Sequence, residues 1–470
     1  MLSQHGTASL PASPLADYGH PPAIQAGELP ADSRQPCVDA RQLAGPALIA
    51  ALRDSRARTW ALVSDLTPAQ WRPPVQEGVN PIAWELAHLA WFAEFWILRG
   101  PHNCTDDGLT QATQPPRIAG PDAVLDSARL LHLARWTTPL PQGNRLTAML
   151  ADQLEACVDA VPSVTDDAAL YAHRLSLFHE DMHGEALCWL RAALGYPAPR
   201  GLAVPQVPQT LDSRPIAVRG GQIQIGVAAR ASGFAFDNER PGRVVDLPDF
   251  EIDSAPVTAI AFARFVDAGG YDQPRYWPGE AGAWRAQSGC KHPQQWRRNP
   301  EPGAGSKADG NVDSKGSLAG RWQTRWQWRW FDQWLPLEPG VPAMHLNAFE
   351  AEAFCLWAGR HLPTAAQWER AAQQNSALNQ PFNQAFNQTF NPTFHWGHSV
   401  WEWTADVFTP YPGFAPGPYR EYSAPWFGDH RELRGGAFAT HARLHEVRYR
   451  NFFLPHRTDV FTGFRTVAPC

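Results

Sequence analysis

Three histidines are the residues of this sequence best suited to chemistry. His179 and His183 stand four positions apart in LFHEDMHGEA, and His88 stands in NPIAWELAHLAWF. Positions i and i+4 share one face of a helix, so the first two imidazoles would project side by side. A third imidazole from another helix would complete a facial three-nitrogen site with positions open for substrate and for water or O2. The spacing therefore predicts a catalytic metal centre.

The segment HEDMH also matches H-E-x-x-H, the helix motif of zinc proteases, in which Glu180 would be the general base. Such an enzyme needs a third ligand on a following helix, and none stands out in LCWLRAALGYPAP. A zinc hydrolase stays an alternative to a site in which Glu180 is incidental and His88 is the third ligand. Glu185 could orient an imidazole from the second shell or be a charge on the helix surface.

Helices must position these histidines, and the first half of the chain has the pattern for them. Apolar residues recur at three- and four-residue spacing, and Asn80 with Pro81 suits the start of a helix. Several long antiparallel helices with modest loops form a four-helix bundle by default, and bundle cores commonly hold metals. The predicted helices cover residues 45–65, 80–100, 121–135, 143–161 and 166–194.

After about residue 200 the pattern changes to short alternating stretches between Gly, Pro and Asn turns, which predicts strands. Two helices interrupt them, at 257–268 and at 347–373, the second broken near Gly359 and Pro363. We expect 292–340, which is dense in Trp and Arg, to be ordered loop. The F-N-Q repeat at 379–394 predicts a surface loop.

Composition limits the possible functions. A chain of 470 residues exceeds one ordinary core, and a net charge of -6 lacks the basic footprint of a nucleic-acid-binding protein. Seven cysteines without a C-x-x-C fit a reducing compartment. Residues 1–40 read as a disordered tail without a signal peptide, and the longest apolar run, around 86–98, is too short to span a bilayer. We expect a soluble, cytoplasmic protein.

The last quarter of the chain carries an ordered series of short motifs: VWEWT, YPGF, RGG, RYRN and GFR. RGG and GFR suit a close backbone approach beside buried arginines. Asn451 is followed by Phe452 and Phe453, and an amide next to aromatic rings could hold a quaternary ammonium through cation–π contacts. Packing in the core explains these aromatic residues equally well.

Together, the motifs resemble the ergothioneine-type sulfoxide synthase family. The series of a histidine-bearing bundle helix, H-x3-H-x-E, DNERP (237–241), APVT (255–258), WAGRHLPTAAQWERAA (357–372) and the C-terminal motifs follows the order of that family from about residue 42 to residue 469. The resemblance implies an α+β protein, in which a DinB-like four-helix bundle (41–200) carrying the iron ligands precedes a loop-rich, C-type-lectin-like FGE-sulfatase domain (201–470).

The resemblance also implies an activity: Fe(II) held by His88, His179 and His183, with O2 used to join a sulfur or selenium nucleophile to the imidazole C2 of hercynine, the trimethylated betaine of histidine. Three neutral imidazoles leave three adjacent positions on octahedral iron for the reactants. The RYRN segment, with Arg450 and Asn451, is where the family holds the betaine, and Phe452 and Phe453 suit its trimethylammonium group.

Departures from the family pattern point to a sister branch. Met182 stands where ergothioneine synthases often have glutamine, and Phe408 and Tyr411 follow WEWT where the family has its acid/base tyrosine, which leaves Tyr411 as the candidate catalytic residue. HLARWTTPLPQ supplies only Arg135 where enzymes that use γ-glutamylcysteine bring two arginines, and a donor with fewer carboxylates needs fewer arginines. We therefore expect a selenoneine synthase, which takes a selenosugar; its Trp- and Arg-rich segment 321–335 also resembles that branch.

Three other functions remain open at this point. The first is an ergothioneine-type synthase that uses γ-glutamylcysteine or cysteine as the donor. The second is the zinc hydrolase, and the third is a non-catalytic binding module on a degenerate FGE-like fold. Formylglycine generation itself is not expected, because the cysteine pair that follows RGG in that enzyme is missing from AFATHARLHEVRYR.

Overall fold

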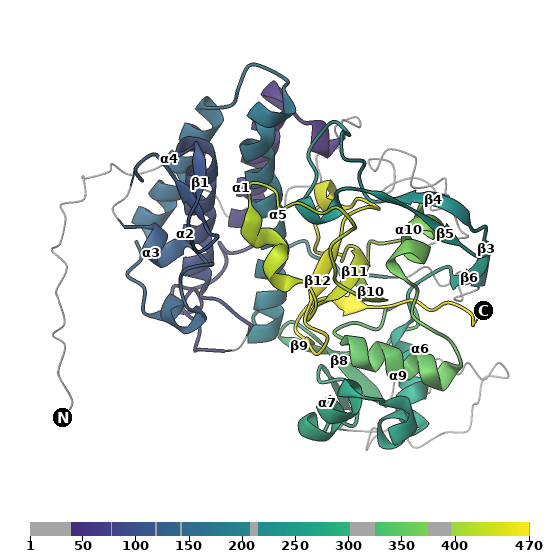
Figure 1. Ribbon diagram of the computed structural model, residues 1–470. Coiled ribbons are helices and arrows are strands. Elements are labelled where there is room, and N and C mark those ends of the chain that lie inside the picture. The colour runs from purple at the N-terminus through teal and green to yellow at the C-terminus, as the bar shows by residue number, and fades with distance from the viewer. Residues whose placement is uncertain are drawn as a thin grey trace, which may run out of the picture.

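A computed structural model describes residues 39–469 except 77, 118–119, 142, 207–214, 301–324 and 375–395. Nearly all of the predicted tail (1–40) and the whole F-N-Q insertion (379–394) lie outside the described residues. A helical region and a mixed region of strands and short helices lie side by side, with one long helix between them (Figure 1). No helix in the described ranges is long and apolar enough to cross a membrane.

The helical region is the predicted four-helix bundle. Its long helices are α1 (Gly45–Ala61), α2 (Ile82–Ala93), α4 (Asn144–Asp159) and α5 (Asp167–Leu194), and α1 and α2 each pack against α4 and α5. Asp166 caps α5 by accepting the backbone N–H of Ala169, and Gly195 ends it in a left-handed conformation. α2 is buried along its whole length, which explains why its sequence is apolar on every side.

Two boundaries differ from the sequence prediction. The helix predicted for 80–100 is α2 followed by a π-helical turn, η2 (Glu94–Leu98). The helix predicted for 121–135 is wrong: the chain forms α3 (Asp122–Leu125) and the 3-10 helix η3 (His132–Trp136), with no helix between them. Asp126 explains the break, because its carboxylate accepts the N–H of Ala128 and pairs with Arg129, offering the backbone a local alternative to the helix. A small hairpin, β1 (His102–Cys104) with β2 (Thr110–Ala112), connects η2 to α3.

The second region is built on a four-stranded sheet in the order β12-β11-β10-β13. β10 pairs in parallel with β13, and the other pairs are antiparallel. Two-stranded sheets β3–β6 and β4–β5 flank it. The helix predicted for 347–373 is broken at Gly359, as expected, into α9 and α10. The elements of this region are β3 (Pro215–Val218), β4 (Gly221–Ile225), β5 (Arg243–Leu247), β6 (Phe250–Asp253), α6 (Ala259–Asp267), α7 (Glu280–Ser288), α9 (Ala348–Ala358), α10 (Ala365–Gln374), β10 (Trp401–Val407), β11 (Arg431–Gly435), β12 (Asn451–Phe453) and β13 (Thr462–Gly463), with short 3-10 turns at Asp237–Glu239, Gly270–Asp272, Pro274–Tyr276, Arg420–Tyr422, Ala424–Trp426 and Ala442–Leu444. Another 3-10 turn, Ala40–Gln42, precedes α1.

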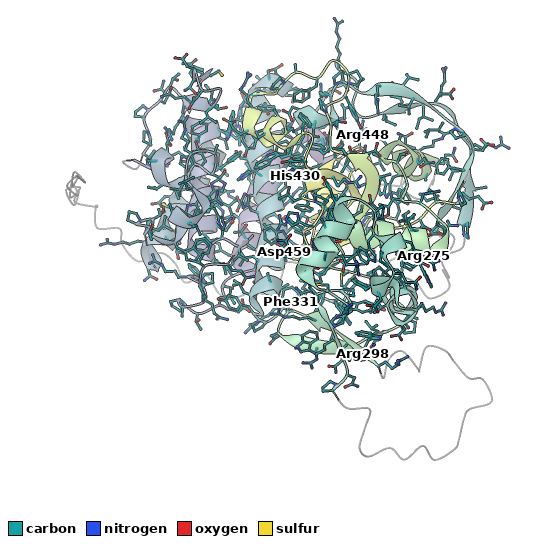
Figure 2. The ribbon with its side chains drawn as sticks, turned by 60° about the horizontal axis from the view of Figure 1, so that its bottom comes forward. Arg275, Arg298, Phe331, His430, Arg448 and Asp459 are labelled. Atoms are coloured by element: carbon teal, nitrogen blue, oxygen red, sulfur yellow. The ribbon has the colours of Figure 1, made fainter. Side chains whose placement is uncertain are left out.

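The expectation of ordered loop over 292–340 is corrected for the described part of that segment. It forms a three-stranded antiparallel sheet of β7 (Trp296–Arg298), β8 (Trp326–Trp330) and β9 (Gln333–Pro336). In β8 buried tryptophans alternate with half-buried polar residues, the period of two that marks a strand packed on one face. One end of this sheet reaches the C-terminus of α5, where the Arg329 guanidinium lies against Gly195, and Arg298 marks its outer edge (Figure 2).

The predicted association of the glycine motifs with buried arginines is confirmed. Arg434 of RGG and Arg465 of GFR are both fully buried, and they pair with Glu369 and Glu402 respectively. Gly435 has a φ of 96°, and its Cα packs against Gly397 and Trp368. A Cβ at this position would lie 3.1 Å from the Gly397 Cα. These glycines therefore serve packing between backbone segments.

Candidate metal centre

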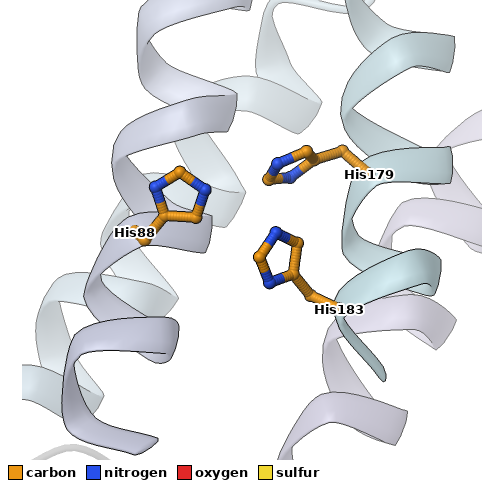
Figure 3. Close-up of side chains that lie close together, drawn as sticks. All are labelled: His88, His179 and His183. Carbon is orange, nitrogen blue, oxygen red and sulfur yellow. The ribbon is translucent and has the colours of Figure 1, made fainter. Parts of the chain in front are cut away.

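His88 of α2 and His179 and His183 of α5 converge in the core of the bundle. One ligand atom from each lies within 4.8 Å of the others, and the ring centroids are 4.4–5.2 Å apart. All three rings point into the space between the two helices (Figure 3). Three imidazole nitrogens at this spacing can surround a single divalent ion, so the donor set fits a three-histidine metal site.

A different contact orients each ring. The Nδ1 of His88 lies 2.7 Å from the carbonyl oxygen of Leu125. The ring of His179 lies flat on Phe92, with centroids 3.5 Å apart. The Nδ1 of His183 lies 2.5 Å from a carboxylate oxygen of Glu85. Because His88 and His183 use Nδ1 for these bonds, each leaves Nε2 as the nitrogen for a metal.

Burial favours the uncharged form of the histidines that lie deepest. It lowers the pKa of His88 to about 3, with a further contribution from His183, and it lowers the pKa of His179 well below the usual range for histidine. Both rings are therefore neutral at physiological pH. A neutral imidazole is the form that binds a metal, so the core holds these ligands ready for one.

Glu180, the general base of the H-E-x-x-H alternative, faces away from the histidines. Its carboxylate pairs with Arg56 of α1, with oxygens 2.6 and 3.0 Å from the guanidinium, and also accepts the hydroxyl of Thr59. Arg56 and Thr59 both lie on α1. Successive residues of an α-helix are separated by about 100° around its axis, so Glu180 faces α1 while His179 faces α2. A buried carboxylate held in this way cannot activate a metal-bound water, which removes the basis for the hydrolase.

Glu185 has neither of the two environments considered from the sequence, an imidazole partner or the helix surface. It is buried, and its carboxylate accepts hydrogen bonds from the indole N–H of Trp401 and the hydroxyl of Thr440, each at 2.6 Å. Both donors belong to the second region. Glu185 therefore ties α5 to that region, and its described hydrogen-bond partners include no imidazole.

Met182 lies at the same junction. Its sulfur accepts the hydroxyl of Tyr449 at 3.2 Å and lies 3.7 Å from the hydroxyl of Tyr422, and the two phenol oxygens are 3.1 Å apart. A third tyrosine, Tyr419, packs its edge against Phe92, with its ring centroid 6.5 Å from that of His179. The predicted substrate residue Met182 is thus surrounded by phenols from the second region.

Sequence reasoning missed these three tyrosines. Tyr419 and Tyr422 stand three residues apart in GPYREYSAPW, and Tyr449 is part of the RYRN motif, whose arginine and asparagine drew attention instead. Burial raises the pKa of Tyr422 and Tyr449, so both phenols stay protonated at neutral pH. The spacing of Tyr419 and Tyr422 was the available signal.

Tyr411, Phe408 and Arg450 lie together in a buried charged cluster of the second region. The hydroxyl of Tyr411 accepts a guanidinium N–H of Arg434 at 3.1 Å. Arg450 stacks over the Tyr411 ring at 4.0 Å and pairs with Glu432. Phe408, fully buried, stacks on Phe452 with ring centroids 4.2 Å apart. Arg450 is thus held inside this cluster by its own ion pair.

The RYRN asparagine and its two phenylalanines form strand β12, and successive side chains of a strand point to opposite faces. Asn451 and Phe453 therefore share one face, whereas Phe452 lies on the other, against Phe408. The Arg457 guanidinium lies 5.0 Å from both the Phe453 ring and the ring of Trp189 on α5, so the Asn451–Phe453 face is directed toward α5. The structure therefore places Phe452 and Phe453 on opposite faces of the strand.

Arg135 is half-buried beside the centre. Its guanidinium donates to the side-chain oxygen of Asn80 at 2.8 Å and lies 4.3 Å over the ring of Trp84, which stacks on His88. It is therefore engaged by residues of the bundle itself.

Comparison with known proteins divides the chain in the same way as the fold. Residues 51–187 match the DinB superfamily, and residues 202–399 and 394–469 match the sulfatase-modifying factor enzyme 1-like domain. The chain is 30% identical to hercynine oxygenase of Mycolicibacterium smegmatis over 446 residues, which cover 87% of this chain and 96% of that protein. It is 31% identical to hercynine oxygenase of Mycolicibacterium thermoresistibile, covering 88% and 93%. The formylglycine-generating enzyme of Thermomonospora curvata is 27% identical, covering 56% of this chain and 95% of that protein.

Proposed function

The chain belongs to the hercynine oxygenase family and is an oxygen-dependent oxidoreductase, and from that premise we propose that it is a selenoneine synthase. It would form a carbon–selenium bond between a selenosugar and the imidazole C2 of hercynine. The family and the combination of a DinB-like bundle with a sulfatase-modifying-factor-like domain were predicted from the motifs and are confirmed. The choice of donor and metal is the proposal.

We assign Fe(II) to the three histidines. The neutral state of His88 and His179 and the convergence of one nitrogen from each of the three rings support a divalent ion. Bound there, Fe(II) would supply the site at which O2 is activated beside the two substrates. The chain's own contribution is to hold three ligands from two rigid helices.

Hercynine would bind on the side of α5 that faces the second region. Asn451 and Phe453 share the strand face directed toward that helix, and Met182 lies on the helix turn between His179 and His183. An amide can donate to the substrate carboxylate, and an aromatic face attracts the trimethylammonium group. The phenols around Met182 shield this side from bulk water and are placed to hold or pass a proton.

We rest the choice of a selenosugar on one observation: Phe408, one of the two residues after WEWT where the family has its acid/base tyrosine, is stacked on Phe452 and has no hydroxyl to offer. Arg135 supports the same choice, because its guanidinium is already bonded to Asn80 and stacked on Trp84. A γ-glutamylcysteine donor carries two carboxylates that need cationic partners. A neutral sugar does not.

A donor competition tests the proposal. Purified protein is loaded with Fe(II) and given hercynine and O2 with equal concentrations of a selenosugar, γ-glutamylcysteine and cysteine, and the products are identified by mass. We expect the selenium-containing product to dominate. A predominance of the γ-glutamylcysteine or cysteine adduct would assign the chain to the ergothioneine-type enzymes instead, and hydrolysis of substrates without O2 would overturn the oxygenase assignment.

A further inference from the structure

The three histidines are held with unequal security. His88 and His179 are buried and are fixed by a backbone carbonyl and a stacked ring, whereas the side chain of His183 is 21% exposed. The polar contact that orients the His183 ring is the 2.5 Å hydrogen bond between its Nδ1 and the Glu85 carboxylate. The geometry of the site is therefore most sensitive to whatever fixes Glu85.

Glu85 lies on α2, one turn before His88, and its side chain is 3% exposed. Its second oxygen accepts the side-chain N–H of Asn80 at 2.5 Å. Asn80 in turn accepts the Arg135 guanidinium at 2.8 Å. A continuous chain of hydrogen bonds thus runs from Arg135 through Asn80 and Glu85 to His183.

The same arginine also contacts the other side of the site. Its guanidinium lies 4.3 Å over Trp84, and Trp84 stacks on the ring of His88 at 4.8 Å and 10°. Arg135 therefore supports one ligand on each helix, His88 through an aromatic ring and His183 through two polar side chains. Its position is that of a support for the site.

The hydrogen bond between His183 and Glu85 also selects the nitrogen that faces the metal. A carboxylate accepts hydrogen bonds, so Nδ1 of His183 donates to Glu85 at 2.5 Å and Nε2 is left with its lone pair. A carboxylate behind a ligating imidazole also makes that ligand more basic.

We propose that Glu85 is a positioning residue that fixes the tautomer and ring orientation of His183 for metal binding, and that Arg135 acts on the site through Asn80 and Trp84 and does not bind a substrate carboxylate. The inference rests on the proposed function for the identity of the site as a metal centre. It is independent of which chalcogen donor the enzyme takes.

Metal binding without substrate tests it. The full-length metal-free protein is titrated with Co(II), and the affinity and the visible absorption of the complex are recorded for Glu85→Gln and Glu85→Asp. Loss of a partner behind a ligand typically weakens metal binding about 10- to 100-fold, so we expect that loss in Glu85→Gln with an altered cobalt spectrum. Glu85→Asp, which keeps the charge, is expected to recover part of both.

Glu94→Gln is the matched control. Glu94 follows α2 in η2, is similarly buried, and accepts the backbone N–H of Arg117 and not an imidazole. It should bind Co(II) as the wild type does. Asn80→Ala leaves the Glu85–His183 bond in place and should weaken Co(II) binding by less than Glu85→Gln. This variant tests the series of hydrogen bonds from Arg135 to His183 even if the Glu85 variants fail to fold.

Arg135→Met separates the two roles of the arginine. We expect weaker Co(II) binding and an unchanged KM for the chalcogen donor. Wild-type affinity and spectrum in Glu85→Gln, or a raised donor KM with unchanged metal binding in Arg135→Met, would overturn the inference and leave the proposed function standing. A wild-type protein that binds no Co(II) would overturn both.

Discussion

Glu180 and Arg56 form a buried ion pair that joins α5 to α1, with carboxylate oxygens 2.6 and 3.0 Å from the guanidinium. The side chains are 7% and 4% exposed. The residue that gives HEDMH its likeness to a protease motif is thus a structural element of the bundle. The histidines on either side of it face another helix.

Glu180→Gln should lower stability and leave metal binding intact. Removing one charge of a buried pair leaves the other uncompensated, at a cost of roughly 3 kcal/mol in the free energy of unfolding. Chemical denaturation and metal content of the purified variant measure the two effects. A variant of normal stability that keeps its metal but has lost all turnover would restore the hydrolase hypothesis.

His179→Ala should abolish both stoichiometric metal binding and turnover, because two remaining imidazoles cannot hold a facial three-nitrogen site. Metal analysis after gel filtration and product detection by mass provide the measurement. His173→Ala is the matched control on the same helix: His173 is also buried, but its Nε2 faces the carbonyl of Cys157. His173→Ala should lose some stability and keep its metal. Turnover retained by His179→Ala would contradict the assignment of the metal site.

The tyrosines at the junction should affect catalysis more than the predicted Tyr411. Tyr449→Phe removes the hydroxyl that donates to Met182, and we expect lower kcat with metal binding unchanged. Tyr411→Phe removes an acceptor of Arg434 and should cost about 1 kcal/mol of stability with little change in kcat. Steady-state kinetics and thermal denaturation on both variants decide the matter. The reverse pattern would support Tyr411 as the catalytic residue.

Glu350 should make the second region less stable as pH rises. Burial raises its pKa to about 7, although Tyr271 and the Asn347 backbone donate to it. A carboxyl whose folded pKa is above its unfolded pKa stabilises the fold below about pH 4.5, and this contribution is lost as pH rises through about 7. The shift corresponds to roughly 3 kcal/mol.

Glu350→Gln keeps the capping box of α9 and removes the titration. Urea denaturation at pH 5 and pH 8 should therefore show a smaller loss of stability for the variant than for the wild type. Equal losses in the two proteins would show that the ionisation of Glu350 is not coupled to folding.

Local periodicity made the bundle and the pairing of His179 with His183 predictable from the sequence. His179 and His183 lie on one helix face because the α-helix repeats every 3.6 residues, whatever surrounds it. Side-chain competition with the backbone broke the predicted helix at Asp126. The tryptophans of β8 were missed as a strand although their alternation was visible in WQWRW.

What each side chain of α5 meets is decided by tertiary structure alone. Glu180 finds Arg56, Glu185 finds Trp401, and Met182 finds Tyr449, partners between 124 and 267 residues away. Helical spacing tells which residues share a face, but the partner of that face depends on how helices and sheet pack. The sequence by itself therefore determined which two histidines share a face of α5 and, through its motif order, the family. Packing decided that Glu85 lies against His183 and that Tyr449 lies against Met182, because contacts between distant segments form only when the whole core closes.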